Sequence, residues 1–275
     1  MFLVAVVLGL VAGEATHSDA DWKQLAPGME LRLLAAKQPS PVGDSRIAVL
    51  RMDPKSWQLE LVAQGQSGEP ARRTARGWAQ SHDLAVAINA GMFAEDYATH
   101  VGYMETRGRV NSSRINGYQS VAAFGPHDRE NAASFRIFDL DVPGVTVQSI
   151  RQEYASLVQN LRLIKRPGTN RWSPQGKSWS EAALAEDEDG RILFVFSRSP
   201  FSMHHLVREL LSAGIGIVAA QHLEGGRLAQ LYLKVADVEL ELFEGSEGSL
   251  GVDRGIATAW PIPNVLGVRR RPSVK

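Results

Sequence analysis

The sequence places a carboxylate directly before two glycines, in Glu224-Gly225-Gly226. The apolar run 215–220 predicts a strand, so Glu224 is expected near the end of that strand. Two glycines at such a point let a ligand approach the backbone closely. His222 lies two positions earlier, on the same side of a continuing strand, and could orient the carboxylate or donate to a phosphate oxygen. The same residues also fit a hairpin turn with a surface glutamate and a structural histidine.

A second candidate element is the hexamer Ile88-Asn89-Ala90-Gly91-Met92-Phe93. The run 85–88 is apolar, which predicts a strand buried on both faces, with Asn89 at its end. Gly91 allows a backbone turn with positive φ. A polar amide at the mouth of a buried strand could hold a ligand. Alternatively, Asn89 forms an Asx-turn that satisfies its own backbone.

The hexamer resembles the signature of the phosphodiester glycosidase family. Six further segments resemble other parts of that family, in the same order along the chain: 22–28, 46–53, 74–79, 101–103, 219–231 and 261–266. The resemblance implies a single α+β domain with a mixed, largely antiparallel sheet. It also implies hydrolysis of a sugar-1-phosphodiester, or of a related glycosidic bond, in an envelope or extracellular glycan. The expected partner is therefore a carbohydrate or sugar-phosphate substrate.

Glycosidases usually need two carboxyl groups, one as acid and one as nucleophile or base. The resemblance makes Glu224 the main catalytic carboxylate, in place of the family's aspartate. Asp96 is its expected partner, because family members often carry an acid between Gly91 and Gly102, and Glu95 is the rival. A phosphate leaving group is weakly basic, so a single carboxylate could also suffice. The residues expected to bind substrate are Asn89, Gly91, Met92, Phe93, Gly102, Tyr103, Gln119, His222, Gly225 and Gly226.

The chain departs from the family pattern in two places. Arg227 and Leu228 follow the two glycines, where the family often has glycine and serine. Ser180 and Glu181 stand where the family usually has an arginine, the natural fork for a phosphate. Lys177 or Arg171 could replace that arginine. These departures leave open a non-catalytic protein that binds carbohydrate or the envelope, whereas no positive feature favours a purely structural envelope protein.

Composition limits the other possibilities. The 275 residues carry 30 basic and 30 acidic side chains, and this zero net charge argues against a nucleic-acid binder. Cysteine is absent, which rules out disulfides and thiolate chemistry. The sequence has no His-x-x-x-His pair, the spacing that would indicate a zinc site. No cofactor is predicted, although a calcium or magnesium ion held by loop carboxylates stays open.

The N-terminus resembles an export signal. Residues 2–12 are almost wholly apolar but too short to span a bilayer, and small residues follow in Gly13-Glu14-Ala15. No Lys or Arg precedes the run, so a buried strand is the alternative. We expect a signal peptide over 1–15 and a mature domain over 16–275. The mature protein would be periplasmic or secreted and would have no transmembrane segment.

Local patterns predict an α+β domain with about three helices and many short strands. Strands are expected at 46–52 and 57–63, paired as a hairpin around Asp53-Pro54. A second hairpin is expected from 181–186 and 191–197. Helices should follow Thr74 and Ser202, the latter ending at Gly214. Further strands are expected at 121–124, 215–220 and 229–235. The polar stretch 94–118 predicts a long loop or two strands around Gly108, and 140–180 looks irregular.

Overall fold

The computed structural model describes residues 22–64, 73–128, 130–244 and 258–272. These form one α+β domain with three α-helices and largely antiparallel strands, as predicted, and the strands are divided among three sheets. The predicted signal peptide lies outside the described residues. Among the residues described, no helix is both long and apolar enough to cross a membrane.

The largest sheet has eight strands. Their spatial order is β1 (Lys23–Ala26), β2 (Met29–Ala35), β3 (Arg46–Met52), β14 (Ile192–Phe201), β13 (Trp179–Asp187), β15 (Ile217–Gly225), β11 (Arg162–Lys165) and β12 (Thr169–Asn170).

Two five-stranded sheets complete the strand layers. One has the order β7 (Arg109–Ser112), β6 (Met104–Thr106), β10 (Tyr154–Asn160), β8 (Ser120–Pro126) and β9 (Phe135–Asp139). The other has the order β17 (Val238–Phe243), β16 (Gln230–Val235), β5 (Val86–Asn89), β18 (Asn264–Arg270) and β4 (Trp57–Ala63).

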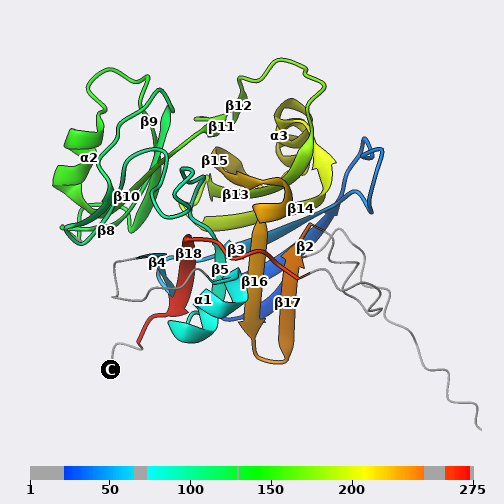
Figure 1. Cartoon of the computed structure of the whole chain (residues 1–275), viewed down its shortest axis with the longest axis horizontal. Helices are drawn as coiled ribbons and strands as arrows, with labels where there is room; N and C mark the ends of the chain where they lie inside the picture. Colours follow the sequence, from blue (N-terminus) through cyan, green and yellow to red (C-terminus); the bar gives the residue numbers. More distant parts are fainter. Residues whose placement is uncertain (1–21, 65–72, 129, 245–257, 273–275) are drawn as a thin grey trace, which may run out of the picture.

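The large sheet has an apolar cluster on each face. The main cluster joins one face of it to residues of both smaller sheets, and a second cluster joins the other face to α3 (Met203–Ser212). Helix α1 (Ala75–Ser81) packs on the sheet that contains β5, and α2 (Val147–Glu153) packs on the sheet that contains β10 (Figure 1). The three sheets therefore meet at one core, and each helix closes an outer face.

Strand β14 shows why the large sheet must be central. Ile192 and Phe194 belong to the main cluster, whereas Leu193 and Val195 belong to the cluster under α3. Successive side chains of a strand point to opposite faces, so a continuous apolar run is stable only when both faces are covered. The run 192–196 meets that requirement.

The helices begin where their capping residues predict. Thr74 and Ser202 accept the backbone N–H groups of Gly77 and His205, and Gly214 follows α3 with a φ of +64°. Helix α2 was not predicted, because the segment around it looked irregular. Its two buried residues, Val147 and Ile150, give only a weak helical period, and Thr146 starts it through a capping box.

The predicted hairpin of 46–52 and 57–63 is wrong, although both strands exist. Strand β3 pairs with β2 and β14, whereas β4 pairs with β18 in a different sheet. Both strands contribute apolar side chains to the main cluster. The turn after Met52 therefore carries the chain from one sheet to another across the core.

The remaining strand predictions agree with the structure. Strands β6 and β7 form the pair around Gly108. The hairpin of β13 and β14, and the strands β8, β15 and β16, all lie within a few residues of the predicted positions. Strands β1, β2, β9 and β17 had no prediction, and β10, β11 and β12 lie in the segment 140–180 that looked irregular.

Candidate functional site

The candidate site lies where the end of β15 meets the start of β13. These antiparallel strands place Glu181 opposite Gly225 and Ala183 opposite His222. The register shifts between these two pairs, because Leu223 is an extra residue on β15. Its side chain enters the main core cluster. Such a bulge bends a strand and re-aims the side chains beside it, here His222 and Glu224.

Glu181 and His222 form a buried pair. The Oε1 atom of Glu181 lies 2.5 Å from Nδ1 of His222, and the two side chains are only 2% and 5% exposed. The other carboxylate oxygen accepts a hydrogen bond of 2.9 Å from Nε1 of Trp179. Burial opposes the charged imidazole, but the charge and hydrogen bond of Glu181 raise the pKa of His222. The imidazole is therefore held in a fixed orientation.

Glu224 is a second buried carboxyl group next to this pair. Its side chain accepts a hydrogen bond of 3.0 Å from the backbone N–H of Gly225, and the residue is 9% exposed. Burial raises its pKa to about 7, with a further contribution from Glu181, whereas the Gly225 N–H and His222 oppose the rise. A carboxyl group with this pKa is present in both protonation states near neutral pH.

Of the two predicted glycines, Gly225 packs tightly against β13 and Gly226 is joined to it by a hydrogen bond. A Cβ atom on Gly225 would lie 2.5 Å from Cδ1 of Trp179, so only glycine fits beside that indole. Gly226 has a φ of +65°, and its carbonyl accepts a hydrogen bond of 3.0 Å from the Ser180 hydroxyl. The glycines thus keep the Glu224 loop against Trp179 and Ser180.

Asn89 connects the signature hexamer to the same loop. Its Nδ2 donates to the carbonyl of Leu228 at 2.9 Å, and its Oδ1 accepts from the backbone N–H of Gln230 at 2.7 Å. The side chain is 1% exposed. Asn89 therefore does not cap its own turn. It holds the segment that follows Glu224 and Gly225.

Gly91 packs against two buried polar side chains from other parts of the chain. A Cβ atom there would collide with the His100 imidazole and with Oδ1 of Asn160. Nε2 of His100 lies 2.7 Å from the carbonyl of Gln159, and burial lowers the pKa of His100 to about 4. Among the described residues, His100 Nδ1 and Asn160 Oδ1 have no hydrogen-bond partner. Two unpaired polar atoms beside a glycine form a place that can receive a polar ligand group.

Gly102 and Tyr103 contact the same strand as Gly91 does. A Cβ on Gly102 would lie 2.6 Å from the carbonyl of Gln159, and the Tyr103 N–H donates to Oε1 of Gln159 at 3.2 Å. The Tyr103 ring belongs to the cluster under α2, and its hydroxyl donates to Glu105. Burial and this hydrogen bond raise the pKa of Tyr103 to about 12. The backbone of this segment, rather than the phenol, therefore faces the Gln159 region.

A chain of contacts links the early motifs to Glu224. Asn160 ends β10, and the carbonyl of the next residue, Leu161, accepts a hydrogen bond of 2.9 Å from the His222 backbone N–H. Nε2 of Gln221 donates to the carbonyl of Val158 on β10. Residues far apart in sequence are thereby joined through β10 to the end of β15.

Met92 and Phe93 are partly buried at the start of the loop that follows. The Met92 carbonyl accepts from the Val101 N–H at 3.2 Å, and Phe93 forms an isolated bridge with His100. The Phe93 ring packs against Tyr97, with 5.3 Å between the ring centroids. Both residues shape the loop that carries Asp96.

Asp96 and Glu95 are exposed in this loop. The Asp96 carboxylate accepts hydrogen bonds from the backbone N–H groups of Ala98 and Thr99, both at 2.9 Å, and from the Thr99 hydroxyl at 2.5 Å. These bonds lower the pKa of Asp96, with the Thr99 hydroxyl as the largest cause. The carboxylate is therefore ionised at neutral pH and already has a local structural role.

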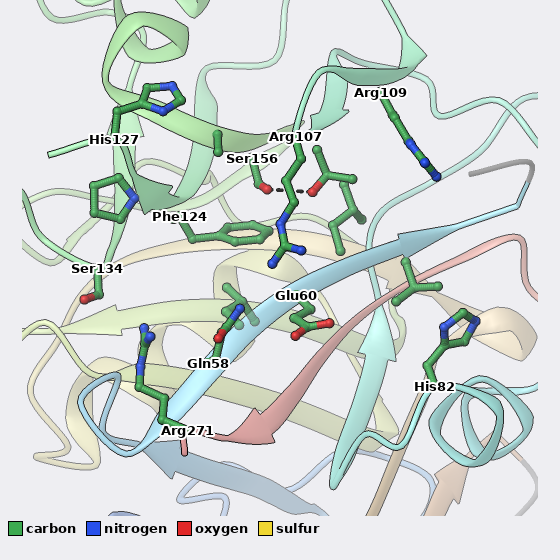
Figure 2. A pocket seen from close by; sticks show the side chains of 17 residues that line it. Gln58, Glu60, His82, Arg107, Arg109, Phe124, His127, Ser134, Ser156 and Arg271 are labelled. Atoms are coloured by element: carbon green, nitrogen blue, oxygen red, sulfur yellow. Dashed lines mark hydrogen bonds between the residues drawn. The ribbon is translucent and has the colours of Figure 1, made fainter. Parts of the chain in front are cut away.

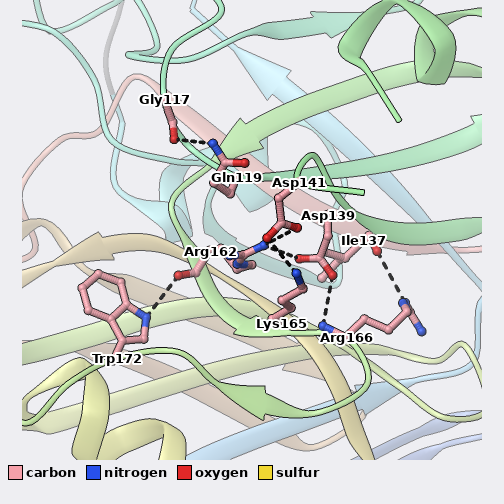
Figure 3. A network of polar contacts seen from close by, with 9 residues as sticks. All are labelled: Gly117, Gln119, Ile137, Asp139, Asp141, Arg162, Lys165, Arg166 and Trp172. Atoms are coloured by element: carbon pink, nitrogen blue, oxygen red, sulfur yellow. Dashed lines mark hydrogen bonds and ion pairs between the residues drawn. The ribbon is translucent and has the colours of Figure 1, made fainter. Parts of the chain in front are cut away.

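Gln119 lies beside a network of ion pairs, shown in Figure 3. Its Nε2 donates to the carbonyl of Gly117 at 3.0 Å rather than to a charged neighbour. In the network, Arg162 lies 2.8 Å from Asp141 and 3.2 Å from Asp139. Hydrogen bonds from Lys165 and Arg162 lower the pKa of Asp141 to about 2. Although β11 places Arg162 opposite Gln221, its guanidinium is committed to these aspartates.

Sequence reasoning missed several residues of this region. Glu181 was noted only because it stands where the family usually has an arginine, yet it is the partner of His222. Trp179, His100 and Asn160 were not considered. The signal for Glu181 lies in the pairing of β13 with β15, which local patterns do not contain. Among the described residues, no group of three or more His, Asp or Glu side chains could hold a metal ion.

Comparisons with known proteins agree with the fold. A family model described as phosphodiester glycosidase matches residues 82–269. A search of curated proteins finds no match. The catalytic domain of zebrafish N-acetylglucosamine-1-phosphodiester alpha-N-acetylglucosaminidase, auto-inhibited by its pro-peptide, has a similar structure, with 14% identity and a TM-score of 0.62. That match covers 90% of this chain and 85% of the zebrafish one.

Two bacterial structures are also similar. A hypothetical protein from Synechocystis shows 15% identity and a TM-score of 0.57, over 89% of this chain and 62% of that one. A putative exported protein from Burkholderia pseudomallei K96243 shows 12% identity and a TM-score of 0.51, over 81% and 73%. At these identities the likeness concerns the fold.

Proposed function

Because the chain belongs to the phosphodiester glycosidase family, we propose that it is an exported hydrolase acting on envelope or extracellular glycans. The bond that it cleaves is a sugar-1-phosphodiester or a related glycosidic bond. The observation that carries this proposal is Glu224, a buried carboxyl group with a pKa of about 7, beside the His222–Glu181 pair and at a glycine loop.

Glu224 is suited to transfer a proton. Near neutral pH its protonated form can donate to the leaving oxygen of the scissile bond, and its ionised form can then accept a proton from water. Glu181 and His222 act as positioning residues. Their hydrogen bond fixes the imidazole, and the imidazole in turn favours the ionised form of Glu224.

Asp96 is the proposed second carboxylate. Its lowered pKa keeps it ionised, as a base on water or a nucleophile requires. Its loop begins at Phe93, two positions after Gly91, the glycine that packs on His100 and Asn160. The substrate would then lie between the Asp96 loop and the Glu224 loop.

The test is a screen of the purified protein against nitrophenyl glycosides and sugar-1-phosphodiesters, with and without calcium. Turnover that Glu224→Gln abolishes would support the proposal. Saturable binding of the same glycans without turnover would instead favour a carbohydrate-binding protein on this scaffold, an alternative that the departures at Glu181 and Glu224 keep open. Turnover that persists in Glu224→Gln would move the catalytic site elsewhere.

A further inference from the structure

A polar groove lies beside β4, and none of its lining residues belongs to the site described above. Figure 2 shows this groove, a cavity of about 740 Å³ between β4 and the sheet of β6, β8 and β10. Gln58 and Glu60 of β4 line one side, and Phe124 of β8 and Ser156 of β10 line the other. Among the described strands, β4 pairs with β18 alone, so its outer edge forms part of the wall.

The groove is rich in positive charge. Arg107 reaches it from the turn between β6 and β7, Arg109 from the first position of β7, and Arg271 from beyond the end of β18. In Figure 2, Arg107 and Arg271 extend from opposite sides, with Gln58 and Glu60 between them. Among the described residues that line the groove, Glu60 is the one carboxylate, and it is paired with Arg269 at 2.9 Å.

Two of these arginines differ in how they are held. The Nε atom of Arg271 donates to the carbonyl of Pro54 at 2.8 Å, which fixes the side chain at the groove. Within the described part of the chain, the Arg107 guanidinium has no hydrogen-bond or ion-pair partner. A partnerless arginine at a groove with excess positive charge is available to an anionic ligand.

The groove continues into a second cavity of about 540 Å³. Arg107, His127 and Ala155 line both cavities. The second adds Gln148 and Gln152 of α2, together with Glu105, which is paired with Arg151 at 2.7 Å. Two cavities that share walls accommodate an elongated ligand better than a single small anion. Amide, hydroxyl and imidazole groups along such a path can bond to sugar hydroxyls.

We propose that this arginine groove binds a glycan chain that carries carboxylate or phosphate groups. The inference does not depend on whether Glu224 is catalytic. A nucleic acid is a poorer fit, because single-stranded nucleic acids bind through exposed aromatic side chains. Among the described residues that line the two cavities, the Phe, Tyr and Trp side chains are Phe124 and Tyr154, and each is only 3% exposed. The zero net charge of the chain also argues against binding of a nucleic acid.

The test measures binding of labelled six-residue oligouronate and of poly(glycerol phosphate), each by fluorescence anisotropy at low and high salt. Arg107→Asn is the main variant, because Arg107 has a φ of +49° that asparagine tolerates well. It should weaken binding about two- to fivefold, and Arg107→Asn/Arg271→Ala should weaken it further. Arg208→Ala, at an exposed position on α3, is the matched control and should bind normally.

Comparing the two polymers shows whether the groove prefers a glycan with carboxylate groups or one with phosphate groups. Glu224→Gln should leave binding to the groove unchanged, so failure of the hydrolase proposal and failure of this one are distinguishable. The groove proposal is overturned if the double variant, with an unchanged melting temperature, binds both polymers as the wild type does. It is also overturned if maltohexaose, which is neutral, or a single-stranded oligonucleotide binds more tightly than either anionic glycan.

Discussion

Nδ1 of His222 lies 2.5 Å from Oε1 of Glu181, although 41 positions separate the two residues in the chain. The contact exists because β15 returns beside β13 after helix α3, with a bulge at Leu223. Glu224 lies next to this pair, close enough for each of its members to influence its pKa. The proposed chemistry therefore depends on a strand pairing as much as on the identity of the carboxylate.

Glu224→Gln should keep the fold and reduce turnover by about 10²–10⁴-fold, because an amide cannot transfer the proton. Glu224→Asp restores the residue usual in the family but shortens its reach, so it should be impaired yet active. Steady-state kinetics together with thermal melts check both variants. If Glu224 is only a turn residue without a catalytic role, both variants will match the wild type in rate and in melting temperature.

The free energy of unfolding should fall as pH rises through neutrality. The pKa of Glu224 is about 7 in the folded protein and near 4.5 in the unfolded chain, so the unfolded state loses this proton first. His222 adds to the effect, because its raised pKa stabilises the folded state below the ordinary histidine value and ceases to do so above. Glu224 alone should contribute about 2–3 kcal/mol between pH 4 and pH 8.

Denaturant titrations at several pH values measure this slope. Glu224→Gln should flatten it and should be more stable than the wild type at pH 8, because the variant has no buried carboxylate to ionise. An identical pH dependence in the two proteins would show that Glu224 is not buried in solution.

Glu181→Gln should lower the pKa of His222, because the charge of Glu181 would no longer oppose the burial of the imidazole and only the smaller contribution of Glu224 would remain. The glutamine can still bond to His222 and Trp179, so we expect a stability loss of about 1–3 kcal/mol rather than unfolding. An NMR titration follows the imidazole directly. The signals of His204 and His205 on α3 serve as internal references, and a His222 titration that does not move would contradict the pairing.

Gly91→Ala should destabilise the protein by about 1–3 kcal/mol, because the new methyl group would collide with His100 and Asn160. Gly117→Ala is the matched control, since no atom lies within 4 Å of the position of its Cβ. That control should change stability by less than about 0.5 kcal/mol. Chemical denaturation measures both, and equal effects would mean that the packing around Gly91 is loose.

Asp96→Asn tests the second carboxylate. The exposed asparagine can still accept hydrogen bonds from the loop, so stability should change little while turnover falls strongly. Glu95→Gln, one position earlier and also exposed, is the control and should remain active. Should Glu95→Gln lose activity and Asp96→Asn keep it, the two assignments are reversed.

Local sequence signals predicted most of the elements. Apolar runs and alternation predicted β13, β14 and β16, and Thr74 and Ser202 predicted the helix starts. These features depend on residues a few positions apart. The fold class came from the same patterns together with a resemblance spread over several segments.

Signals that depend on distant pairing were not visible in the sequence. The turn after Met52 looks like a hairpin, yet its strands belong to different sheets: β3 lies between β2 and β14, and β4 lies beside β18. The contact of Glu181 with His222 follows from the pairing of β13 with β15, which local sequence patterns do not show. No periodicity in one segment reveals which other segment will lie against it.

The position of β18 makes one sheet depend on the C-terminal part of the described chain. This strand lies between β5 and β4, pairing Val268 with Val86 on one side and with Leu59 on the other. Strands β4 and β5 are made early in synthesis but have no direct ladder with each other. A chain arrested before residue 264 would therefore expose two apolar strand edges and invite aggregation. Closure of this sheet therefore requires residues 264–270, although both strands that β18 joins precede them by more than 170 positions.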